Sequence, residues 1–217
     1  MRTKSKDLPE GKTRVIVVRH GETEHNTQRR FMGQSDSPLT DLGYRQIEAV
    51  ARRLSGHHVA AIYCSDLGRA AATATKIADR CSLSLTHDTR LRERALGVIE
   101  GMVSTEARAE YPEIFAALDI GDEEFAIPGG ESVSQVRERT LEILKGLAKE
   151  HPGKTVVAVS HGFTIRTLLG YALGLDYSTF RKLPCDNTSL NVFTISDDRL
   201  ALESWNDSGH LSNLQSA

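Results

Sequence analysis

The sequence predicts an α/β fold, a three-layer α/β/α sandwich whose mostly parallel sheet has an antiparallel edge, plus a helical lid insertion. Short apolar runs rich in β-branched residues recur along the chain, and segments of helical periodicity lie between them. This alternation is typical of a parallel sheet covered by helices on both faces. One irregular stretch, at about residues 98–130, interrupts it and predicts the lid.

The strands of the predicted sheet are short and continuously apolar, as expected for strands buried on both faces. Three such runs are residues 15–18, 60–64 and 156–159. Two further β-rich segments, residues 188–195 and 200–205, stand on either side of Asp197 and Asp198. This arrangement predicts a hairpin, which supplies the antiparallel edge.

The helices are predicted from periodicity and from capping residues. Thr40 can cap a helix over residues 41–54, whose apolar residues share one face. Ser132 and Gln135 have the spacing of a capping box, and the long helix that follows ends at the His-Pro-Gly of residues 151–153. Two more helices are expected, one over about residues 66–81 and one from just after Gly162 to Gly174.

The chain organisation predicted is one domain with a tail. We expect a flexible N-terminal tail at residues 1–13 and a single domain at residues 14–210 that carries the lid at about residues 98–130. The lid contains proline and glycine breakers around a helical patch at residues 105–118.

Composition excludes several classes of function. Lys and Arg number 27 against 29 Asp and Glu, so the chain as a whole has no basic surface for nucleic acid or an anionic membrane. No apolar run approaches the roughly 20 residues that span a bilayer, and we expect no secretory signal because residues 1–14 lack an apolar stretch. The three widely spaced cysteines predict reduced thiols and a cytoplasmic location. The oligomeric state stays open, with a dimer as one option.

Two predicted strands end in similar residues, Arg19-His20-Gly21 and Ser160-His161-Gly162. The carboxyl ends of strands in an open α/β sheet line the ligand crevice, so both imidazoles can meet over one site. The glycines allow close backbone approach to a ligand, and a helix N-terminus after His161 favours an anion. The alternative is that each His only ends a strand.

Arg69 follows the end of a third predicted strand, and its position also indicates an anion site. It falls in the first turn of the helix after residues 62–65, where a cation opposes the helix dipole. An anionic partner would account for its position, and together with Arg19 it could grip one phosphate by bidentate hydrogen bonds. The alternative is a solvated surface arginine.

These residues resemble the signature of the histidine phosphatase superfamily, which also contains the cofactor-dependent phosphoglycerate mutases. The resemblance covers about residues 14–205. It is carried by residues 19–23 with Asn26, residues 30–33, residues 36–40 with Gly43, residues 65–67 with Arg69 and Ala70, Arg90, Leu91 and Glu93, residues 128–132, and residues 160–162.

The resemblance implies a role for each matching residue. His20 is the nucleophile that accepts the phosphoryl group, Glu93 donates a proton to the leaving oxygen, and His161 also belongs to the catalytic set. The phosphate pocket implied is Arg19, Arg69, His161, Asn26 and Gly162, with Thr23, Arg30 and Gly33 as substrate-binding residues.

The chemistry sets two expectations for this site. His20 must be neutral at the attacking nitrogen, and a hydrogen bond from its other nitrogen to a carbonyl would fix that tautomer. Glu93 must carry a proton, so we expect burial or the incoming phosphate dianion to raise its pKa. Arginines and a histidine can stabilise the charge of the transition state without a metal ion. No histidine cluster has the spacing of zinc ligands. The resemblance implies no cofactor.

The function predicted is hydrolysis of small phosphomonoesters, the substrate being the only partner, with broad specificity as one option. The rivals are a phosphoglycerate mutase and a non-catalytic phospho-ligand binding protein. The lid holds eight carboxylates against Arg108, which predicts a negative field at the entrance and a preference for neutral, zwitterionic or aromatic leaving groups. The alternative is that these carboxylates form only the solvated outer face of the lid.

Overall fold

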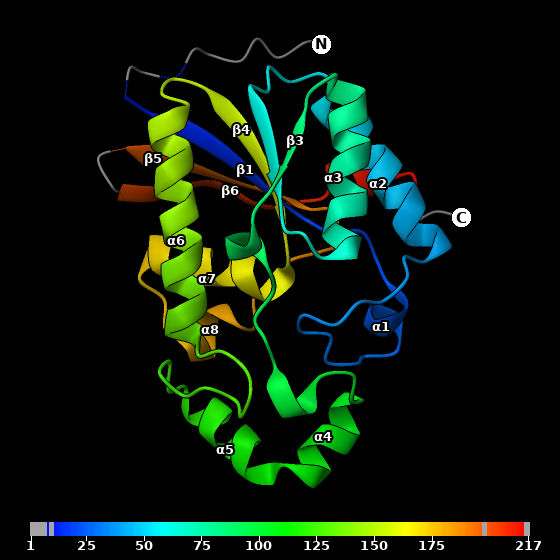
Figure 1. Cartoon of the computed structure of the whole chain (residues 1–217), viewed down its shortest axis with the longest axis vertical. Coiled ribbons are helices and arrows are strands. Elements are labelled where there is room, and N and C mark those ends of the chain that lie inside the picture. The colour runs from blue at the N-terminus through cyan, green and yellow to red at the C-terminus, as the bar shows by residue number, and fades with distance from the viewer. Residues whose placement is uncertain (1–7, 9–10, 197–198, 215–217) are drawn as a thin grey trace.

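The computed structural model describes residue 8, residues 11–196 and residues 199–214. Within them lies a six-stranded sheet of order β3-β2-β4-β1-β5-β6 (Figure 1). Strands β1 to β4 pair in parallel, β5 pairs antiparallel with β1, and β6 pairs antiparallel with β5. The predicted sheet is confirmed. The strands are β1 Thr13–Arg19, β2 Ala61–Cys64, β3 Leu85–His87, β4 Thr155–Ser160, β5 Leu190–Ser196 and β6 Arg199–Asp207.

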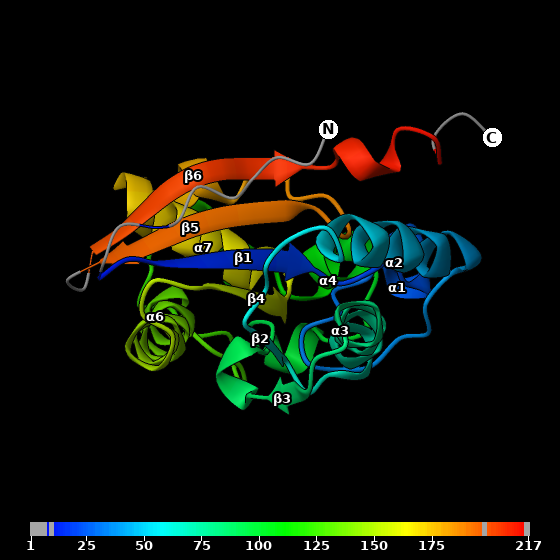
Figure 2. The same ribbon diagram turned by 90° about the horizontal axis from the view of Figure 1, so that it is seen from above.

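Helices cover both faces of the sheet, as the sandwich prediction requires. Figure 2 shows the sheet with α2 and α3 on one side and α6 and α7 on the other. One apolar core packs α2 and α3 on the sheet through residues such as Val50 and Ile77, and a second packs α6 and α7 through residues such as Leu144 and Ile165. The helices are α1 Glu24–Thr27, α2 Asp41–Leu54, α3 Gly68–Cys81, α4 Ser104–Glu110, α5 Pro112–Ile120, α6 Val133–Glu150, α7 Gly162–Leu173 and α8 Tyr177–Phe180.

The helix ends follow the capping chemistry seen in the sequence. The Thr40 hydroxyl accepts a hydrogen bond from the Gly43 N–H at 2.9 Å, which starts α2. Ser132 and Gln135 form the reciprocal capping box of α6. Gly174 ends α7 in the left-handed conformation, with φ of 65°, where glycine has no steric penalty.

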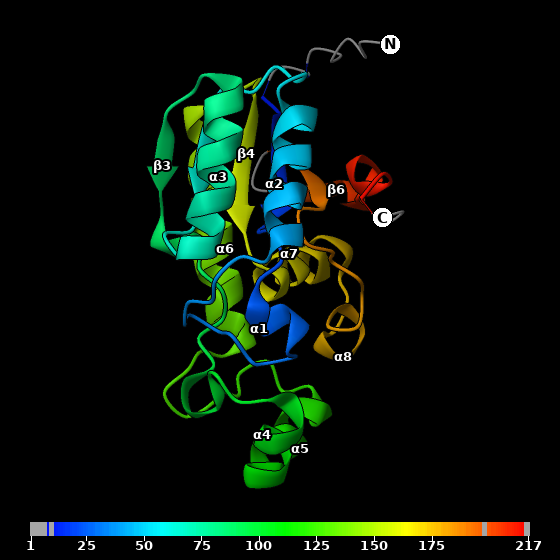
Figure 3. The same cartoon turned by 90° about the vertical axis from the view of Figure 1, so that its right-hand side faces the viewer.

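The lid lies beyond the end of the sheet at which the parallel strands finish (Figures 1 and 3). It has its own apolar cluster, which includes Ile99, Phe115 and Ile127 and extends to Tyr177 and Phe180 of α8. The single helical patch expected at residues 105–118 is two helices, α4 and α5. Tyr111, which precedes Pro112, has a non-helical backbone, as a residue before proline usually does.

Other expectations differ in detail from the structure. β3 was not predicted, because three residues with a single half-buried leucine carry too little pattern. The helix expected from about residue 66 begins at Gly68. Most of the predicted tail and the Asp197-Asp198 turn lie outside the described residues, and Thr13 already belongs to β1. No helix in the described part of the chain is long and apolar enough to cross a membrane.

Candidate active site

His20 and His161 follow the neighbouring parallel strands β1 and β4. Arg19 pairs with Ser160 in the strand register, and the His20 N–H donates to the Ser160 carbonyl at 3.1 Å. The two imidazole ring centroids are therefore only 5.2 Å apart, with 55° between the ring planes. Both side chains are buried. The structure thus brings together the two histidines that the matching strand ends pointed to.

The tautomer of His20 is set by its own backbone. Its Nδ1 lies 2.7 Å from the Gly21 carbonyl oxygen, which can only accept, so Nδ1 carries the hydrogen and Nε2 the lone pair. Burial, then the charges of Arg69 and Arg19, place the pKa of His20 well below its usual value. Burial, Arg69 and His20 do the same to the pKa of His161. Both rings are neutral at neutral pH, as nucleophilic attack by His20 requires.

Arg19 and Arg69 flank the two rings with their side chains fixed by main-chain carbonyls. Arg19 Nη1 donates to the Cys185 carbonyl at 2.5 Å. Arg69 donates to the Ser35 and Gly33 carbonyls at 2.8 and 2.7 Å. Arg69 is only 2% exposed, so the alternative of a solvated surface arginine is wrong.

Several buried polar atoms at this site have no hydrogen-bond partner among the described residues. They are Nε of Arg19, Nε of Arg69 and both ring nitrogens of His161. Buried polar groups are nearly always hydrogen-bonded, so such a group calls for an explanation. Guanidinium and imidazole donors are suited to bind the oxygens of a phosphate group. A Cβ at Gly162 would lie 3.2 Å from Arg19 Nε, so the glycine leaves space beside that guanidinium group.

Glu93 meets the N-terminus of α7, the helix that follows His161. Its Oε2 accepts from the Phe163 N–H and its Oε1 from the Thr164 N–H, each at 3.1 Å. The Thr164 hydroxyl and the Arg94 N–H also donate to Oε1. Helix α7 has no capping side chain of its own at His161, so Glu93 takes that role from another part of the chain.

The remaining predicted residues fall into two groups. Asn26, Arg30 and Gly33 line the same cavity as His20, whereas Thr23 does not. Thr23 is fully buried and caps the short helix α1, its side chain accepting from the Asn26 N–H. Asn26 Oδ1 accepts from the Thr23 N–H and from Asn187 Nδ2, which leaves its own amide NH₂ for other acceptors.

We name this space, about 300 Å³ in volume, the histidine cavity. None of the eight lid carboxylates lines it, but Glu100 accepts from the Gln34 and Leu96 N–H groups and its charge acts on Arg69, so the negative field at the entrance stays a prediction. The residues that line it are Arg19, His20, Asn26, Arg30, Phe31, Met32, Gly33, Arg69, Glu93, Arg94, Leu96, Ile99, Leu118, Ile127, Gly162, Phe163, Arg166 and Tyr177.

Two arginines of the cavity were missed by the sequence reasoning. Arg166 is the only charged residue of α7, an otherwise apolar helix, and that contrast was the available signal. Its Nε donates to the Leu183 carbonyl at 2.7 Å. Arg94 gave no signal beside Glu93. It is buried, donates to the Glu131 and Phe125 carbonyls, and lies over the Phe163 ring at 5.1 Å.

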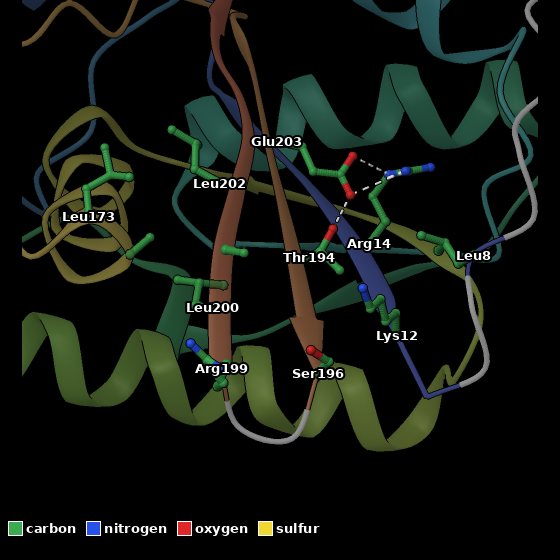
Figure 4. A pocket seen from close by; sticks show the side chains of 12 residues that line it. Leu8, Lys12, Arg14, Leu173, Thr194, Ser196, Arg199, Leu200, Leu202 and Glu203 are labelled. Carbon is green, nitrogen blue, oxygen red and sulfur yellow. Dashed lines mark hydrogen bonds and ion pairs between the residues drawn. The ribbon is translucent and has the colours of Figure 1, made fainter.

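A second hollow, of about 700 Å³, lies at the β5–β6 edge of the sheet (Figure 4). We name it the edge hollow. It is lined by Leu8, Lys12, Arg14, Ala172, Leu173, Thr194, Ser196 and residues 199–203. Its Glu203 accepts from Arg14 Nε at 2.9 Å and also from Thr194. No residue that the sequence singled out for chemistry lies there. Across the described residues, no group of three or more His, Cys, Asp or Glu side chains is placed to hold a metal ion.

Comparison with known proteins gives a consistent result. A family model described as histidine phosphatase superfamily (branch 1) matches residues 15–208. The chain is similar to phosphoglycerate mutase-like protein 4 of Arabidopsis thaliana, with 38% identity over 91% of this chain and 86% of the relative. It is also similar to the metal-independent phosphoserine phosphatase of the same plant, with 36% identity over 93% and 84%. Among solved structures, a vanadate complex of mycobacterial glucosyl-3-phosphoglycerate phosphatase matches with a TM-score of 0.81 and 33% identity, over 90% of this chain and 99% of the other.

Proposed function

The chain belongs to the histidine phosphatase superfamily, and on that premise we propose that His20 is the nucleophile of a phosphatase for small phosphorylated carboxylic acids. The chain is a metal-independent phosphomonoester hydrolase that acts through a phosphohistidine. One observation carries the assignment of residues: His20 lines the same cavity as Arg19 and Arg69, whose Nε atoms lack partners among the described residues, and the buried neutral ring of His161, which does not itself line the cavity, lies 5.2 Å from the His20 ring.

In the first step, His20 Nε2 attacks the phosphorus atom and the bond from phosphorus to the leaving oxygen breaks. Glu93 gives its proton to that oxygen, which departs as an alcohol. In the second step, Glu93 accepts a proton from water, and the resulting hydroxide oxygen bonds to phosphorus as the phosphorus–nitrogen bond breaks. Inorganic phosphate leaves, and both residues return to their starting states.

Arg19, Arg69 and His161 stabilise the charge that spreads over the three equatorial oxygens in the transition state. Phosphoryl transfer depends mainly on positioning and electrostatic stabilisation. Because main-chain carbonyls fix both guanidinium groups before substrate binds, little reorganisation is needed at the moment of reaction.

The charge balance of the cavity supports the substrate class. Five arginines line it against a single carboxylate, Glu93. A phosphate dianion offsets only part of that positive charge, so a leaving group that carries a carboxylate fits better than a neutral one. The two phosphatases among the relatives, named for phosphoserine and for glucosyl-3-phosphoglycerate, act on substrates of this kind. This proposal replaces the substrate preference inferred from the acidic lid.

Trapping the phosphoenzyme tests the nucleophile. Enzyme mixed with p-nitrophenyl phosphate and quenched in base should carry phosphate on His20 by mass spectrometry, with and without EDTA. Phosphate on His161 instead, or a rate that EDTA removes and a divalent ion restores, would contradict the assignment. Incubation with 3-phosphoglycerate tests the mutase rival, since we expect phosphate release to exceed isomerisation.

Matched substrate pairs test the substrate class. O-phosphoserine and O-phosphoethanolamine differ only by a carboxylate, and 3-phosphoglycerate has a carboxylate where glycerol 3-phosphate has a hydroxymethyl group. The carboxylate member of each pair should have the higher kcat/KM, by about tenfold, and the difference should shrink in Arg166→Gln. Equal kcat/KM within both pairs would remove the carboxylate from the proposal and leave the phosphatase assignment intact.

The proposal includes a cytoplasmic location, supported by the cysteines. Cys64, Cys81 and Cys185 are free thiols. Burial, then the nearby Asp66, raises the pKa of Cys64 to about 12, which keeps that thiol protonated and unreactive. Unpaired cysteines are typical of reducing compartments. Fractionation of the tagged protein would test this location.

A further inference from the structure

Arg139 of α6 and Glu131, just before the helix cap Ser132, form an ion pair next to the segment that carries Glu93. Arg139 Nε donates to Glu131 Oε1 at 2.7 Å and Arg139 Nη2 to Glu131 Oε2 at 2.9 Å. Two parallel hydrogen bonds of this kind fix the plane of the guanidinium group as well as its distance. The side chains are 17% and 21% exposed, so the pair is largely shielded from water.

The same guanidinium holds the main chain around Glu93. Arg139 Nη1 donates to the Arg90 and Arg92 carbonyls, both at 2.8 Å, and Arg139 Nη2 donates to the Glu93 carbonyl at 3.0 Å. With the two bonds to Glu131, these contacts use all five N–H groups of an arginine. Three carbonyls of residues 90–93 are thereby fixed to α6, a helix of the rigid scaffold.

Glu131 holds the other side of the same segment. Its Oε2 accepts from the Ala95 N–H at 2.9 Å, and its own N–H donates to the Ala95 carbonyl at 2.9 Å. Its carbonyl accepts from Arg94 Nε at 2.7 Å. The chains run so close here that a Cβ at Gly130 would lie 2.5 Å from the Ala95 oxygen. Residues 93–95 are therefore held on both sides.

The Glu131 carboxylate stays ionised at neutral pH. Burial raises the pKa of Glu131, but the hydrogen bonds from Arg139 and the Ala95 N–H outweigh it, and the net pKa is lowered. Neither residue lines the histidine cavity, so neither touches the substrate. The charge of Arg139 also helps to lower the pKa of His161, and a substitution that keeps this charge separates that effect from the contacts with the segment that carries Glu93.

We propose that Arg139 and Glu131 are positioning residues for proton transfer, which hold Glu93 where its carboxylate meets both the N-terminus of α7 and the leaving oxygen. The inference rests on the proposed role of Glu93. A general acid must lie within hydrogen-bond reach of the oxygen that it protonates, and a misplacement of about 1 Å can cost about 10²-fold in rate. The Nε2 of His20 does not depend on this segment.

The test compares leaving groups that do and do not need a proton. In Arg139→Lys the positive charge stays but the five-donor fork is lost. We expect kcat/KM for O-phosphoserine to fall by about tenfold or more, and kcat/KM for p-nitrophenyl phosphate by less than about threefold. Arg137→Lys is the matched control, because Arg137 lies on the same helix but contacts Glu123 and Ser134 instead. It should leave both values unchanged.

A double variant shows whether the effect passes through Glu93. If it does, Arg139→Lys lowers phosphoserine turnover in the wild-type background and has no further effect beside Glu93→Gln. Equal losses on both substrates, the same loss in the Glu93→Gln background, or no loss at all would overturn the inference.

Two further measurements keep these outcomes distinct. Circular dichroism reports whether each variant folds, and if Arg139→Lys does not, Glu131→Gln decides by the same criteria. Glu93→Gln alone tests the proposed proton donor. If this variant loses the same fraction of kcat/KM on both substrates, Glu93 is not the proton donor, and the inference about Arg139 and Glu131 fails as well. A leaving-group effect in Glu93→Gln but none in the Arg139 and Glu131 variants overturns only the inference made here.

Discussion

The histidine cavity and the edge hollow are at opposite ends of β1, and the larger of the two is not the one equipped for chemistry. The edge hollow is about 700 Å³ and the histidine cavity about 300 Å³. At the edge hollow, Arg14 and Glu203 neutralise each other, and Thr194 completes the contact. At the histidine cavity, the buried Nε atoms of Arg19 and Arg69 have no partner among the described residues, and neither do the ring nitrogens of His161, the neighbour of His20. Unmet hydrogen-bonding capacity locates the site better than volume does.

The difference has a topological cause. The carboxyl ends of the parallel strands all lie at the same end of the sheet, so the residues after β1, β2 and β4 converge there. The edge hollow is built from the start of β1 and from the antiparallel strands β5 and β6. Side chains there alternate between the two faces of the sheet. The carboxyl ends of the parallel strands lie elsewhere, so functional residues that follow different strands do not meet in the edge hollow.

The largest contrast between the two regions is expected from His20→Ala. Loss of the proposed nucleophile should lower kcat by about 10⁴-fold or more, because the proposed covalent intermediate could then not form in the same geometry. Steady-state release of nitrophenolate gives the number. Leu202→Ala in the edge hollow is the matched control. If the His20 variant keeps near-normal turnover, the mechanism proposed for the histidine cavity is wrong.

Glu93→Gln should give the next largest effect, and an uneven one. Alkyl phosphates need a proton on the leaving oxygen and should lose about 10² to 10⁴-fold in kcat/KM, whereas p-nitrophenyl phosphate should lose far less. A panel of phosphomonoesters that spans leaving-group pKa values measures this dependence. A uniform loss over the panel would assign Glu93 to holding α7 through Phe163 and Thr164 rather than to proton transfer.

The next prediction concerns pH, which should change phosphoenzyme formation in the histidine cavity less than the two substitutions do. Because the pKa values of His20 and His161 are both lowered, phosphoenzyme formation in single turnovers should hold steady from pH 8 to below the ordinary histidine pKa of about 6.5. Stability follows a different course: below that pH the unfolded chain takes up protons that the buried rings refuse, so the free energy of unfolding should fall. A phosphorylation rate that already drops between pH 7.5 and 6.5 would contradict a neutral His20.

The smallest effect is expected in the edge hollow itself. Glu203→Gln removes the ion pair with Arg14, whose side chains are 25% and 34% exposed, so the free energy of unfolding should fall by about 1 kcal/mol or less. Urea unfolding measures the loss, and kcat/KM should stay within about twofold of wild type. A large loss of activity would mean that the two regions are coupled, and their separation would need revision.

Local sequence was sufficient for much of the fold and for the centre of the site. The run of residues 15–18 and the capping residues Thr40 and Ser132 act through neighbours in the chain, so their structural consequences could be predicted. The same holds for His20 and His161, because the end of a buried parallel strand is visible in the sequence and all such ends share one edge of the sheet. The resemblance carried by residues 19–23 added Glu93, which no local pattern marked.

Only the tertiary structure decided which charges face the substrate and which merely face water. The lid carboxylates dominate the local sequence count, yet none of them lines the histidine cavity, which Arg30, Arg94 and Arg166 help to line. Three of the five hydrogen bonds of Arg139 likewise join residues 46 to 49 positions apart, and the other two reach Glu131, 8 positions before it. Sequence patterns record interactions between near neighbours along the chain, whereas the direction of a long charged side chain depends on the surfaces that folding places beside it.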